Sequence, residues 1–356
     1  MNELRQPRSI VKVNGGNMDF ISWETNNNGF YQADTFTVKF PLYTSQVAWW
    51  SQQPSLDTII YDGITATDQS KRTLRIQGFA DSIELDPIQR IVRVTGRDYT
   101  SKLIDTKVAP PNPNYRAYEV AIAYAEKYGL EHSVKPTKSK IGTYYSIDHV
   151  KMTVEKSAWD ILCYLAHQEQ FIVYVSGQTL HFEPLPGESA ARVLTLDNSQ
   201  RITTGPAPSL QFIRNLTLAH GIVVYVRSWN HKSPKGFTVV ARSKRTKDPV
   251  TKKNQPLTGQ EQVYSYTIPN LDRDAAQQKA NAYLAAISKH EVRFDANDIP
   301  GDATLNPFQP VKWNFHGTQY EQTYFLDSII RRYDFETGYT MSLRGKNHSV
   351  DSAVLL

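Results

Sequence analysis

Gly78-Phe79-Ala80-Asp81-Ser82-Ile83 and Tyr324-Phe325-Leu326-Asp327-Ser328-Ile329 follow one pattern, in which an aromatic residue stands two positions before Asp-Ser-Ile. A turn signal follows each segment, and an alternating strand then closes on glycine, a basic residue and Asp or Asn, as Gly96-Arg97-Asp98 and Gly345-Lys346-Asn347. The same order of features twice in one chain indicates a duplicated unit. The alternative is that two unrelated hairpins share only alternation and a terminal glycine. We predict two similar β domains built around equivalent hairpins.

The composition indicates an ordered protein of two or three domains. A length of 356 residues exceeds an average domain, and 40% hydrophobic residues are enough to bury several cores. No apolar run approaches the roughly 20 residues that span a bilayer, and the first residues lack the apolar core of a signal peptide. We therefore expect a protein that is made in a cytoplasm and has no stable membrane insertion.

Alternating apolar residues mark the first third of the chain as mostly β-strand. Phe36, Val38 and Phe40 alternate with polar residues at the period of two that is typical of a half-buried strand. Turn signals lie between the expected strands, with 26–29 (Asn-Asn-Asn-Gly) among them. A short helix is expected at 45–51. We interpret this region as a small all-β domain, a sandwich or a barrel.

After a proline-rich boundary at 110–113, helical spacing appears. Apolar residues at 118–125 predict a helix that ends near Gly129, and the stripe at 158–166 predicts a second helix with Ser157 near its start. A hairpin is expected at 171–182, with further strands at 210–218, 222–229, 236–241 and 262–268. A third helix is expected to begin at Asp272, whose side chain can cap it.

No catalytic template is present in the sequence. The nine His residues include no pair at i, i+4, and there is no Gly-x-Ser-x-Gly elbow or phosphate-binding loop. The single cysteine, Cys163, is expected on the buried face of a helix. We therefore predict no catalytic residues, no cofactor and no metal. Carboxylates such as Glu155 and Asp160 leave open a peptidoglycan hydrolase, although Asp160 is equally explained as a residue of a helix start.

One cluster of positive charge stands out between two expected strands. Its members are separated mainly by polar residues and one aspartate, and they are Arg242, Lys244, Arg245, Lys247, Lys252 and Lys253. A long exposed loop of this kind is a candidate contact for a partner, and the alternative is a solvated loop without a partner. Because aromatic residues do not interleave with the cations, a protein partner is favoured over single-stranded DNA.

Three segments in order along the chain resemble phage tail hub proteins, namely the late control protein D family and the baseplate hubs of Mu-like contractile phages. The first is Val92–Asp105 with its Gly-Arg-Asp strand end, the second is Ser157–Ala166 with the hairpin that follows it, and the third is Asp274–Ile287 leading to the turn at Gly301–Val311. The resemblance implies a structural role, so no catalytic residue carries over.

What the resemblance implies is a homotrimer whose two tube-like β domains per chain form a pseudo-sixfold ring around a channel. Such a ring adapts a hexameric tail tube to a trimeric central spike in the virion baseplate. Its expected partners are the tail tube protein, the central spike protein and other baseplate proteins. DNA would pass through the channel without sequence-specific contact. The alternatives left open are a tail-associated peptidoglycan hydrolase and the hub of a phage-like bacterial injection system.

The expected fold class is mainly β with an α+β insertion. On the family pattern, residues 1–105 form the first tube-like domain, and residues 106–199 with 233–299 form a peripheral α+β region. Residues 200–232 with 300–348 form the second tube-like domain, and 349–356 form a tail. The two tube-like domains are expected to be barrels or sandwiches of one type.

Overall fold

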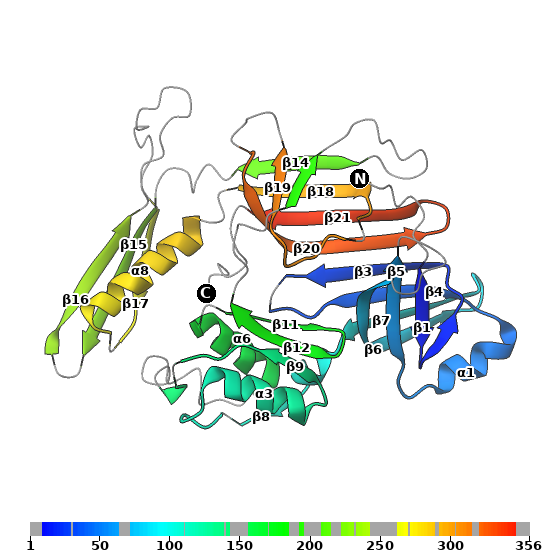
Figure 1. The fold of residues 1–356 in the computed structure, drawn as a ribbon, viewed down its shortest axis with the longest axis horizontal. Coiled ribbons are helices and arrows are strands. Elements are labelled where there is room, and N and C mark those ends of the chain that lie inside the picture. Colours follow the sequence, from blue (N-terminus) through cyan, green and yellow to red (C-terminus); the bar gives the residue numbers. More distant parts are fainter. Residues whose placement is uncertain are drawn as a thin grey trace.

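A computed structural model of the chain describes residues 9–29, 31–63, 72–109, 111–138, 140–142, 156–169, 171–184, 192–195, 208–214, 222–230, 233–242, 262–269, 271–288, 292–302, 304–314 and 320–346. The fold is mainly β, as expected, and is dominated by one large and mostly antiparallel sheet. A smaller α+β unit lies below this sheet in Figure 1, and an appended helix-and-sheet unit lies at its left end.

The first half of the large sheet comes from the N-terminal third of the chain. Four strands pair in the order β3-β4-β7-β6, and β5, β1 and β2 continue from β6. Their bounds are β1 Ile10–Val13, β2 Gly16–Met18, β3 Ser22–Asn28, β4 Thr35–Pro41, β5 Asp57–Gly63, β6 Arg72–Asp86 and β7 Ile91–Asp98. The expected short helix is η1 at Thr44–Gln46 followed by α1 at Val47–Gln52.

The second half of the sheet repeats this order with strands from the last third of the chain. Four strands pair in the order β14-β18-β21-β20, and β19 pairs with the first residues of β20. Their bounds are β14 Ser209–Arg214, β18 Val292–Pro300, β19 Val311–Asn314, β20 Thr323–Asp334 and β21 Gly338–Lys346. Strand β13, Arg192–Thr195, runs parallel to β19. The halves join where β20 pairs with β3, so the two hairpins lie in one continuous sheet.

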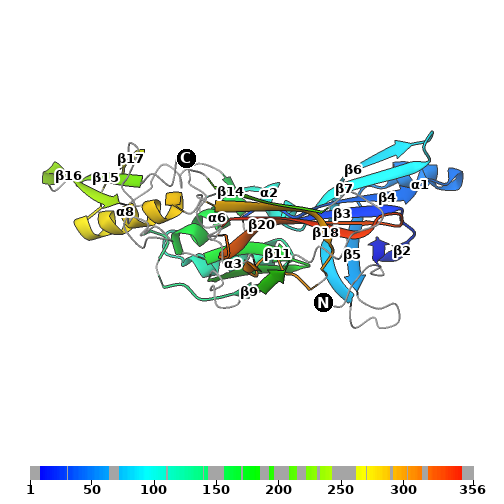
Figure 2. The ribbon, with the colours of Figure 1, turned by 90° about the horizontal axis from the view of Figure 1, so that it is seen from above.

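Each half of the sheet has one apolar face and one polar face. In β4 the side chains of Phe36, Val38 and Phe40 are buried while their neighbours in sequence are not, as the alternation predicts. Separate apolar clusters form under the two halves. Tyr333 and Tyr339 of the second half belong to the cluster of the first half, so the core continues across the junction. Viewed from above in Figure 2, strand β5 and the α+β unit lie on the same side of the sheet.

The α+β unit packs two helices on a small mixed sheet. Helices α3 (Ala117–Lys127) and α6 (Ala158–Glu169) cover strands β11 (Phe171–Ser176), β12 (Thr179–Pro184) and β9 (Glu131–Val134). The apolar stripe predicted for α6 is buried. The Asp160 amide donates a hydrogen bond of 3.0 Å to the Ser157 hydroxyl, which confirms the predicted cap. Short elements connect this unit to β7, namely α2 Ser101–Ile104, β8 Lys107–Val108 and β10 Lys156–Ser157.

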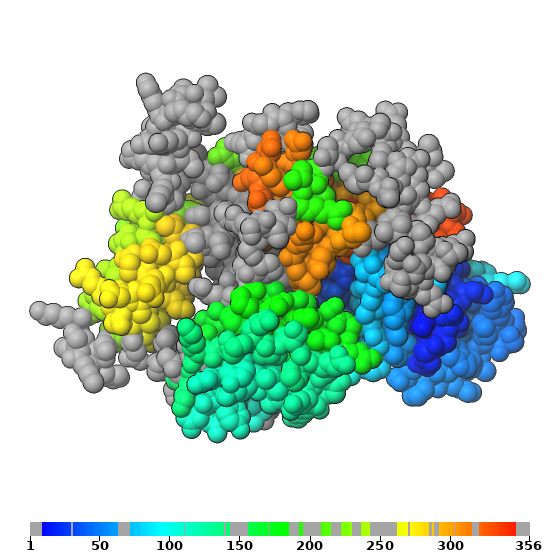
Figure 3. Space-filling model, viewed as in Figure 1, coloured from blue at the N-terminus to red at the C-terminus, as the bar shows by residue number. Residues whose placement is uncertain are grey.

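The appended unit lies between β14 and β18 in the sequence. Helix α8 (Arg273–Ser288) packs on a sheet of β15 (Ile222–Asn230), β16 (Ser233–Arg242) and β17 (Gln262–Thr267). The Asp272 carboxylate accepts a 2.7 Å hydrogen bond from the Ala275 amide, so the predicted cap is confirmed. Figure 3 shows this unit as a separate lobe beside the α+β unit.

The structure corrects the placement of four strands. The asparagines at 26–28, expected in a turn, end strand β3 and pair with β20. Strand β15, expected in the second β domain, pairs with β16 and β17 in the appended unit. Strands β18 and β13, expected in the peripheral region, pair within the second half of the sheet. All four corrections have the same cause. Which sheet a strand joins is decided by its pairing with segments far away in the chain, and short-range sequence patterns do not encode that pairing.

Candidate assembly interface

Both repeated segments carry a β-bulge at the aspartate of Asp-Ser-Ile. The register between β6 and β7 shifts at Asp81, so that the residue before it lies opposite Gly96. The register between β20 and β21 shifts in the same way at Asp327, with Gly345 opposite the preceding residue. A bulge at one position of an antiparallel pair bends the strand and increases its twist. The two hairpins are thus equivalent in register as well as in sequence.

Glycine is required at both positions because a carbonyl oxygen of the paired strand and an aromatic ring both lie against the backbone. A Cβ on Gly96 would meet the Phe79 carbonyl oxygen first and would lie 2.6 Å from a ring carbon of Phe36. A Cβ on Gly345 would lie 2.6 Å from a ring carbon of Phe294 and 2.8 Å from the Phe325 carbonyl oxygen. Phe36 of β4 pairs with Gly96, and Phe294 of β18 pairs with Gly345. These contacts extend the equivalence from the hairpins to the strands beside them.

The basic residue after each glycine forms an ion pair with the aspartate of the bulge. Arg97 binds Asp81 through Nε and Nη2, each at 2.8 Å, and also binds Asp105. Lys346 Nζ lies 3.2 Å from the Asp327 carboxylate. The hydrogen bonds that the Arg97 guanidinium donates to the two carboxylates raise the pKa of Arg97. The recurring Asp and Arg or Lys of the sequence pattern therefore fix the bulge from the polar face of the sheet.

A buried arginine lies at the junction of the two halves. Arg331 of β20 is opposite Thr25 of β3, and it is only 1% exposed. Its Nη1 donates a 2.8 Å hydrogen bond to Asn27 Oδ1, and its Nη2 donates to the Leu305 carbonyl. Burial lowers the pKa of Arg331. Because a buried cation needs partners to offset its desolvation, these contacts link β20, β3 and the loop before β19.

Two carboxyl groups lie next to Asn27 and Asn28, the half-buried Asp34 and the buried Asp98. The side-chain amide of Asn27 donates a 2.7 Å hydrogen bond to Asp34 Oδ2, and the Asn28 amide donates to Asp34 Oδ1. Burial raises the pKa of Asp34 to about 7. Burial, together with the charge of Asp34, raises the pKa of Asp98 as well. The strand that joins the halves is therefore held by a side chain, Asp34, whose charge depends on pH near neutrality.

A second polar contact crosses the same junction. The Tyr339 hydroxyl of β21 donates a 2.8 Å hydrogen bond to Asp62 Oδ2 of β5, and Arg75 Nε lies 2.6 Å from the same oxygen. Asp62 is fully buried. Burial raises the pKa of Tyr339, so its proton stays available for this bond. The two halves are therefore connected by polar side-chain contacts as well as by the pairing of β20 with β3.

The two four-strand units form one path of eight strands in the order β14-β18-β21-β20-β3-β4-β7-β6. Among the strands that the structure describes, each end of this path has a strand edge without a pairing partner. Strand β14 pairs with β18 on one side and is the terminal strand of the path. Strand β6 pairs with β7 along Gly78–Asp86, but β5 accompanies it only up to Phe79. An open edge presents backbone groups to any strand that can add to it. The edge of β6 beyond Phe79 is equivalent to the part of β20 that pairs with β3.

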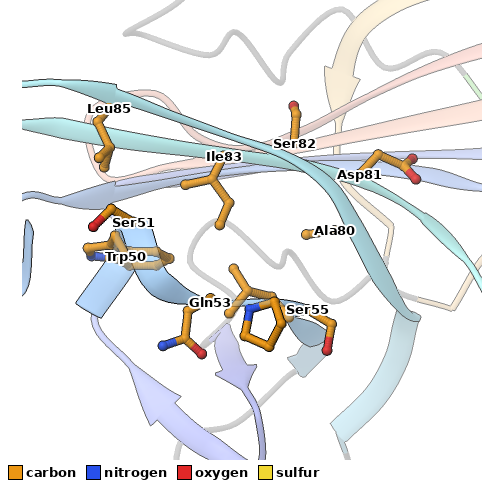
Figure 4. A pocket seen from close by; sticks show the side chains of 11 residues that line it. Trp50, Ser51, Gln53, Ser55, Ala80, Asp81, Ser82, Ile83 and Leu85 are labelled. Atoms are coloured by element: carbon orange, nitrogen blue, oxygen red, sulfur yellow. The ribbon is translucent and has the colours of Figure 1, made fainter. Parts of the chain in front are cut away.

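A pocket of about 290 Å³ lies beside the open part of β6. It is formed between the β6 residues Ala80–Ile83 with Leu85 and the segment that contains α1. Figure 4 shows Ile83 and Leu85 pointing from β6 toward Trp50, while Ser82 points away. The side chains of Ile83 and Leu85 give the pocket an apolar wall on the β6 side. The pocket lies on the apolar face of β6, next to the strand edge that β5 does not cover.

Most of the basic cluster predicted from sequence lies outside the described residues. Arg242 is exposed at the end of β16, and the remaining five cations belong to the segment after it. Cys163 lies on α6 as expected, where it is half-buried and packs against the apolar cluster of the α+β unit, and burial raises the pKa of its thiol. Asp160 is exposed, and Glu155 lies outside the described residues.

No group of three or more His, Cys, Asp or Glu side chains with the geometry of a metal site occurs in the described part of the chain. Within the same part, no helix combines the length and apolarity needed to cross a membrane.

Sequence reasoning missed the junction residues Arg331, Asn27 and Asp34. One signal for Arg331 was available, because alternation places it on the apolar face of β20 between Ile329 and Tyr333. A charged residue at such a position indicates a buried polar contact. The partners could not be identified, since Asn27 is about three hundred residues away in the chain.

No protein-family description matches the sequence, and no curated protein matches it either. Solved structures do match. A tail protein from Neisseria meningitidis MC58 is similar over 98% of each chain, with a TM-score of 0.67 and 13% identity. The 43 kDa tail protein of prophage MuSo2 from Shewanella oneidensis is similar over 95% of this chain and 96% of that one, with a TM-score of 0.65 and 11% identity.

A component of the type VI secretion system from E. coli, described as similar to the T4 tail proteins gp27 and gp5, is similar over 96% of this chain and 77% of that one. Its TM-score is 0.50 and its identity is 9%. The likeness extends along nearly the whole chain at low identity. The chain therefore has the fold of phage tail proteins.

Proposed function

We propose that this chain is a structural hub of a contractile phage tail, a homotrimer that forms a pseudo-sixfold ring between a hexameric tube and a trimeric spike. The observation that carries the proposal is the pair of equivalent four-strand units, β3-β4-β7-β6 and β14-β18-β21-β20, in one sheet. Three copies present six such units while keeping threefold symmetry. The fold shared with phage tail proteins supports the same role.

The polar face of the sheet suits the wall of a channel. Several of its cations are paired with carboxylates: Arg332 with Glu24, Arg93 with Glu84, and Arg97 with Asp81. A cation that already has a carboxylate partner has less affinity for phosphate. DNA would therefore pass along such a wall with weak contacts that do not depend on its sequence. The tail tube protein, the spike protein and other baseplate proteins would bind outside this wall.

Sedimentation equilibrium of the purified chain tests the proposal directly. We expect a mass three times the 40.5 kDa of one chain at micromolar concentration, and particle images with a central hole and six similar densities. A strict monomer at that concentration, or a ring with another number of copies, would contradict the proposal.

The likeness to a type VI secretion component favours a second candidate, the hub of a phage-derived injection system. The two candidates share the ring and differ in the particle that contains it. Mass spectrometry of particles purified from the source cells distinguishes them, since a capsid protein accompanies the chain only in a virion.

A further inference from the structure

The chain contains its own example of how two β units join. Strand β3 adds antiparallel to β20 from Ser328 to Asp334, with Ile330 opposite Asn26 and Arg332 opposite Glu24. If the ring of the proposed function forms, each unit needs the same kind of neighbour on both sides. The two open edges, β14 and the end of β6, are the only described parts of the large sheet in positions equivalent to β3 and β20.

The equivalent positions follow from the pairing registers. Phe36 and Phe294 lie opposite the two equivalent glycines, and they pair outward with Thr25 and Phe212, respectively. Thr25 of β3 therefore corresponds to Phe212 of β14. Counting along the strands then matches Asn26 with Ile213.

On the other side of the joint, the bulges provide the reference point. Asp81 corresponds to Asp327 because both registers shift there. Counting from the bulge matches Ser82 with Ser328, Glu84 with Ile330 and Leu85 with Arg331.

We propose that β14 of one copy adds antiparallel to the open part of β6 in the next copy, with Ile213 opposite Glu84 and Gln211 opposite Asp86. This inference rests on the ring of the proposed function and specifies the contact that closes it. The joint between copies then repeats the joint within the chain, residue for residue. Six equivalent joints, three within chains and three between them, close the sheet without an open edge.

The side chains on the apolar face support this register. On the apolar face Leu85 replaces the buried Arg331, and its opposite residue becomes Phe212 in place of Thr25. An apolar pair thus takes the place of a polar one. Burying this pair on assembly therefore removes no charge from water and carries no desolvation penalty for a charge. The pocket of about 290 Å³ lies on the same face beside Leu85 and Ile83, and it gives the incoming strand's side chains room.

Engineered disulfides test the register. In a Cys163→Ala background, Glu84→Cys with Ile213→Cys places the two thiols directly opposite each other between copies, within the Cα separation that a disulfide requires. We expect oxidation to give covalent trimers on a non-reducing gel. The matched reference is Asn26→Cys with Ile330→Cys, which occupies the same geometry inside one chain and should give an oxidised monomer.

A shifted pair separates this register from a loose contact. Glu84→Cys with Gln211→Cys joins diagonal positions, whose Cα atoms lie about 7–8 Å apart in an antiparallel sheet. Cross-linking should fall at least about tenfold in rate relative to the direct pair, because that distance exceeds the range of disulfides. Equal rates for the two pairs would overturn the proposed register.

Charge variants give a second readout that does not depend on oxidation. Ile213→Glu places a carboxylate opposite Glu84 of the next copy and should raise the concentration for half-dissociation of the trimer about tenfold. Ile213→Lys should leave the trimer intact. Adding Glu84→Lys to Ile213→Glu should restore assembly, since the opposed charges then attract.

The outcomes distinguish a failure of the proposed register from a failure of the proposed trimeric ring. Trimers that form normally, yet neither cross-link at 84 and 213 nor respond to these charges, would overturn this inference and leave the hub proposal standing. A chain that stays monomeric while the reference pair oxidises normally would overturn both.

Discussion

The two hairpins of the sheet differ in what lies beside them, although they share a bulge, a glycine and an ion pair. Hairpin β20–β21 has β3 against its outer strand, with the buried Arg331 reaching across to Asn27. Hairpin β6–β7 has Leu85 at the position equivalent to Arg331, and no described strand pairs with the outer edge of β6 beyond Phe79. The same local design thus serves one closed joint and one open edge.

The difference shows which residues define the unit and which define its surroundings. The bulge aspartate and the close-packed glycine recur in both hairpins, since they fix how the strand bends. The residue that faces the neighbouring strand does not recur. A permanently closed joint tolerates a buried arginine with fixed partners, whereas an edge exposed before assembly carries an apolar residue without that desolvation cost.

The largest effect should come from removing the arginine of the closed joint. Arg331→Leu introduces the residue of the open edge and leaves Asn27 Oδ1 and the Leu305 carbonyl without their donor. We expect a loss of roughly 2–5 kcal/mol in unfolding free energy, measured by urea denaturation, because each buried acceptor left without a donor costs about 1–3 kcal/mol. The control is Arg332→Leu on the opposite face, whose exposed ion pairs should contribute less than about 1 kcal/mol. Equal effects of the two variants would refute the distinction between the joints.

The shared glycines should come next in size, and they test the equivalence itself. Gly96→Ala and Gly345→Ala each press a Cβ against a phenylalanine ring and a backbone carbonyl oxygen, so each should cost roughly 1–3 kcal/mol in thermal or urea unfolding. Gly16→Ala is the control, because its Cβ would meet nothing closer than 3.7 Å. The two hairpins would not be structurally equivalent if one of the first two substitutions proved neutral.

The carboxyl groups behind the closed joint make its stability depend on pH. Burial raises the pKa of Asp34 to about 7 from an ordinary 3.8, so the folded state holds a proton that the unfolded state releases. Stability from this group is complete below about pH 4 and is lost as the pH rises through 7. Asp34→Asn should therefore reduce the fall in unfolding free energy between pH 4 and 7, as measured by urea titrations at several pH values. An unchanged pH profile would contradict the assignment.

The smallest effects should come from the ion pairs on the polar face. Arg97 binds two carboxylates and Lys346 binds one, so Arg97→Gln should cost more than Lys346→Gln. Both losses should stay near or below about 1 kcal/mol, and they should shrink in high salt. Salt-independent losses would indicate that packing of the side-chain stems, rather than charge, fixes the bulges.

Elements with a local signal could be predicted from the sequence. The helices α3, α6 and α8, the cap residues Ser157 and Asp272, and the two equivalent hairpins follow from periodicity and from residue types with local preferences. The duplicated Asp-Ser-Ile pattern was readable because the bulge depends on residues within one hairpin.

Elements that depend on distant partners could not be predicted. Three successive asparagines have a strong turn preference, yet they form a strand because β20 and Asp34 satisfy their backbone and side-chain groups. The interface follows the same rule. Whether a strand end such as Ser82–Asp86 is covered or open depends on which other segments reach it, and that information is not local.

The appended unit enters and leaves the sheet at a hairpin. Strands β14 and β18 are antiparallel neighbours that pair up to Arg214 and Val292, just as β3 and β4 pair up to Asn26 and Thr35 across a short connection. The described elements of the appended unit, β15–β17 and α8, are thus connected to the large sheet through the adjacent ends of β14 and β18, and the pairing of these two strands sets their own register. These adjacent strand ends are an attachment point, where evolution or protein engineering can exchange one appended unit for another while the large sheet keeps its shape.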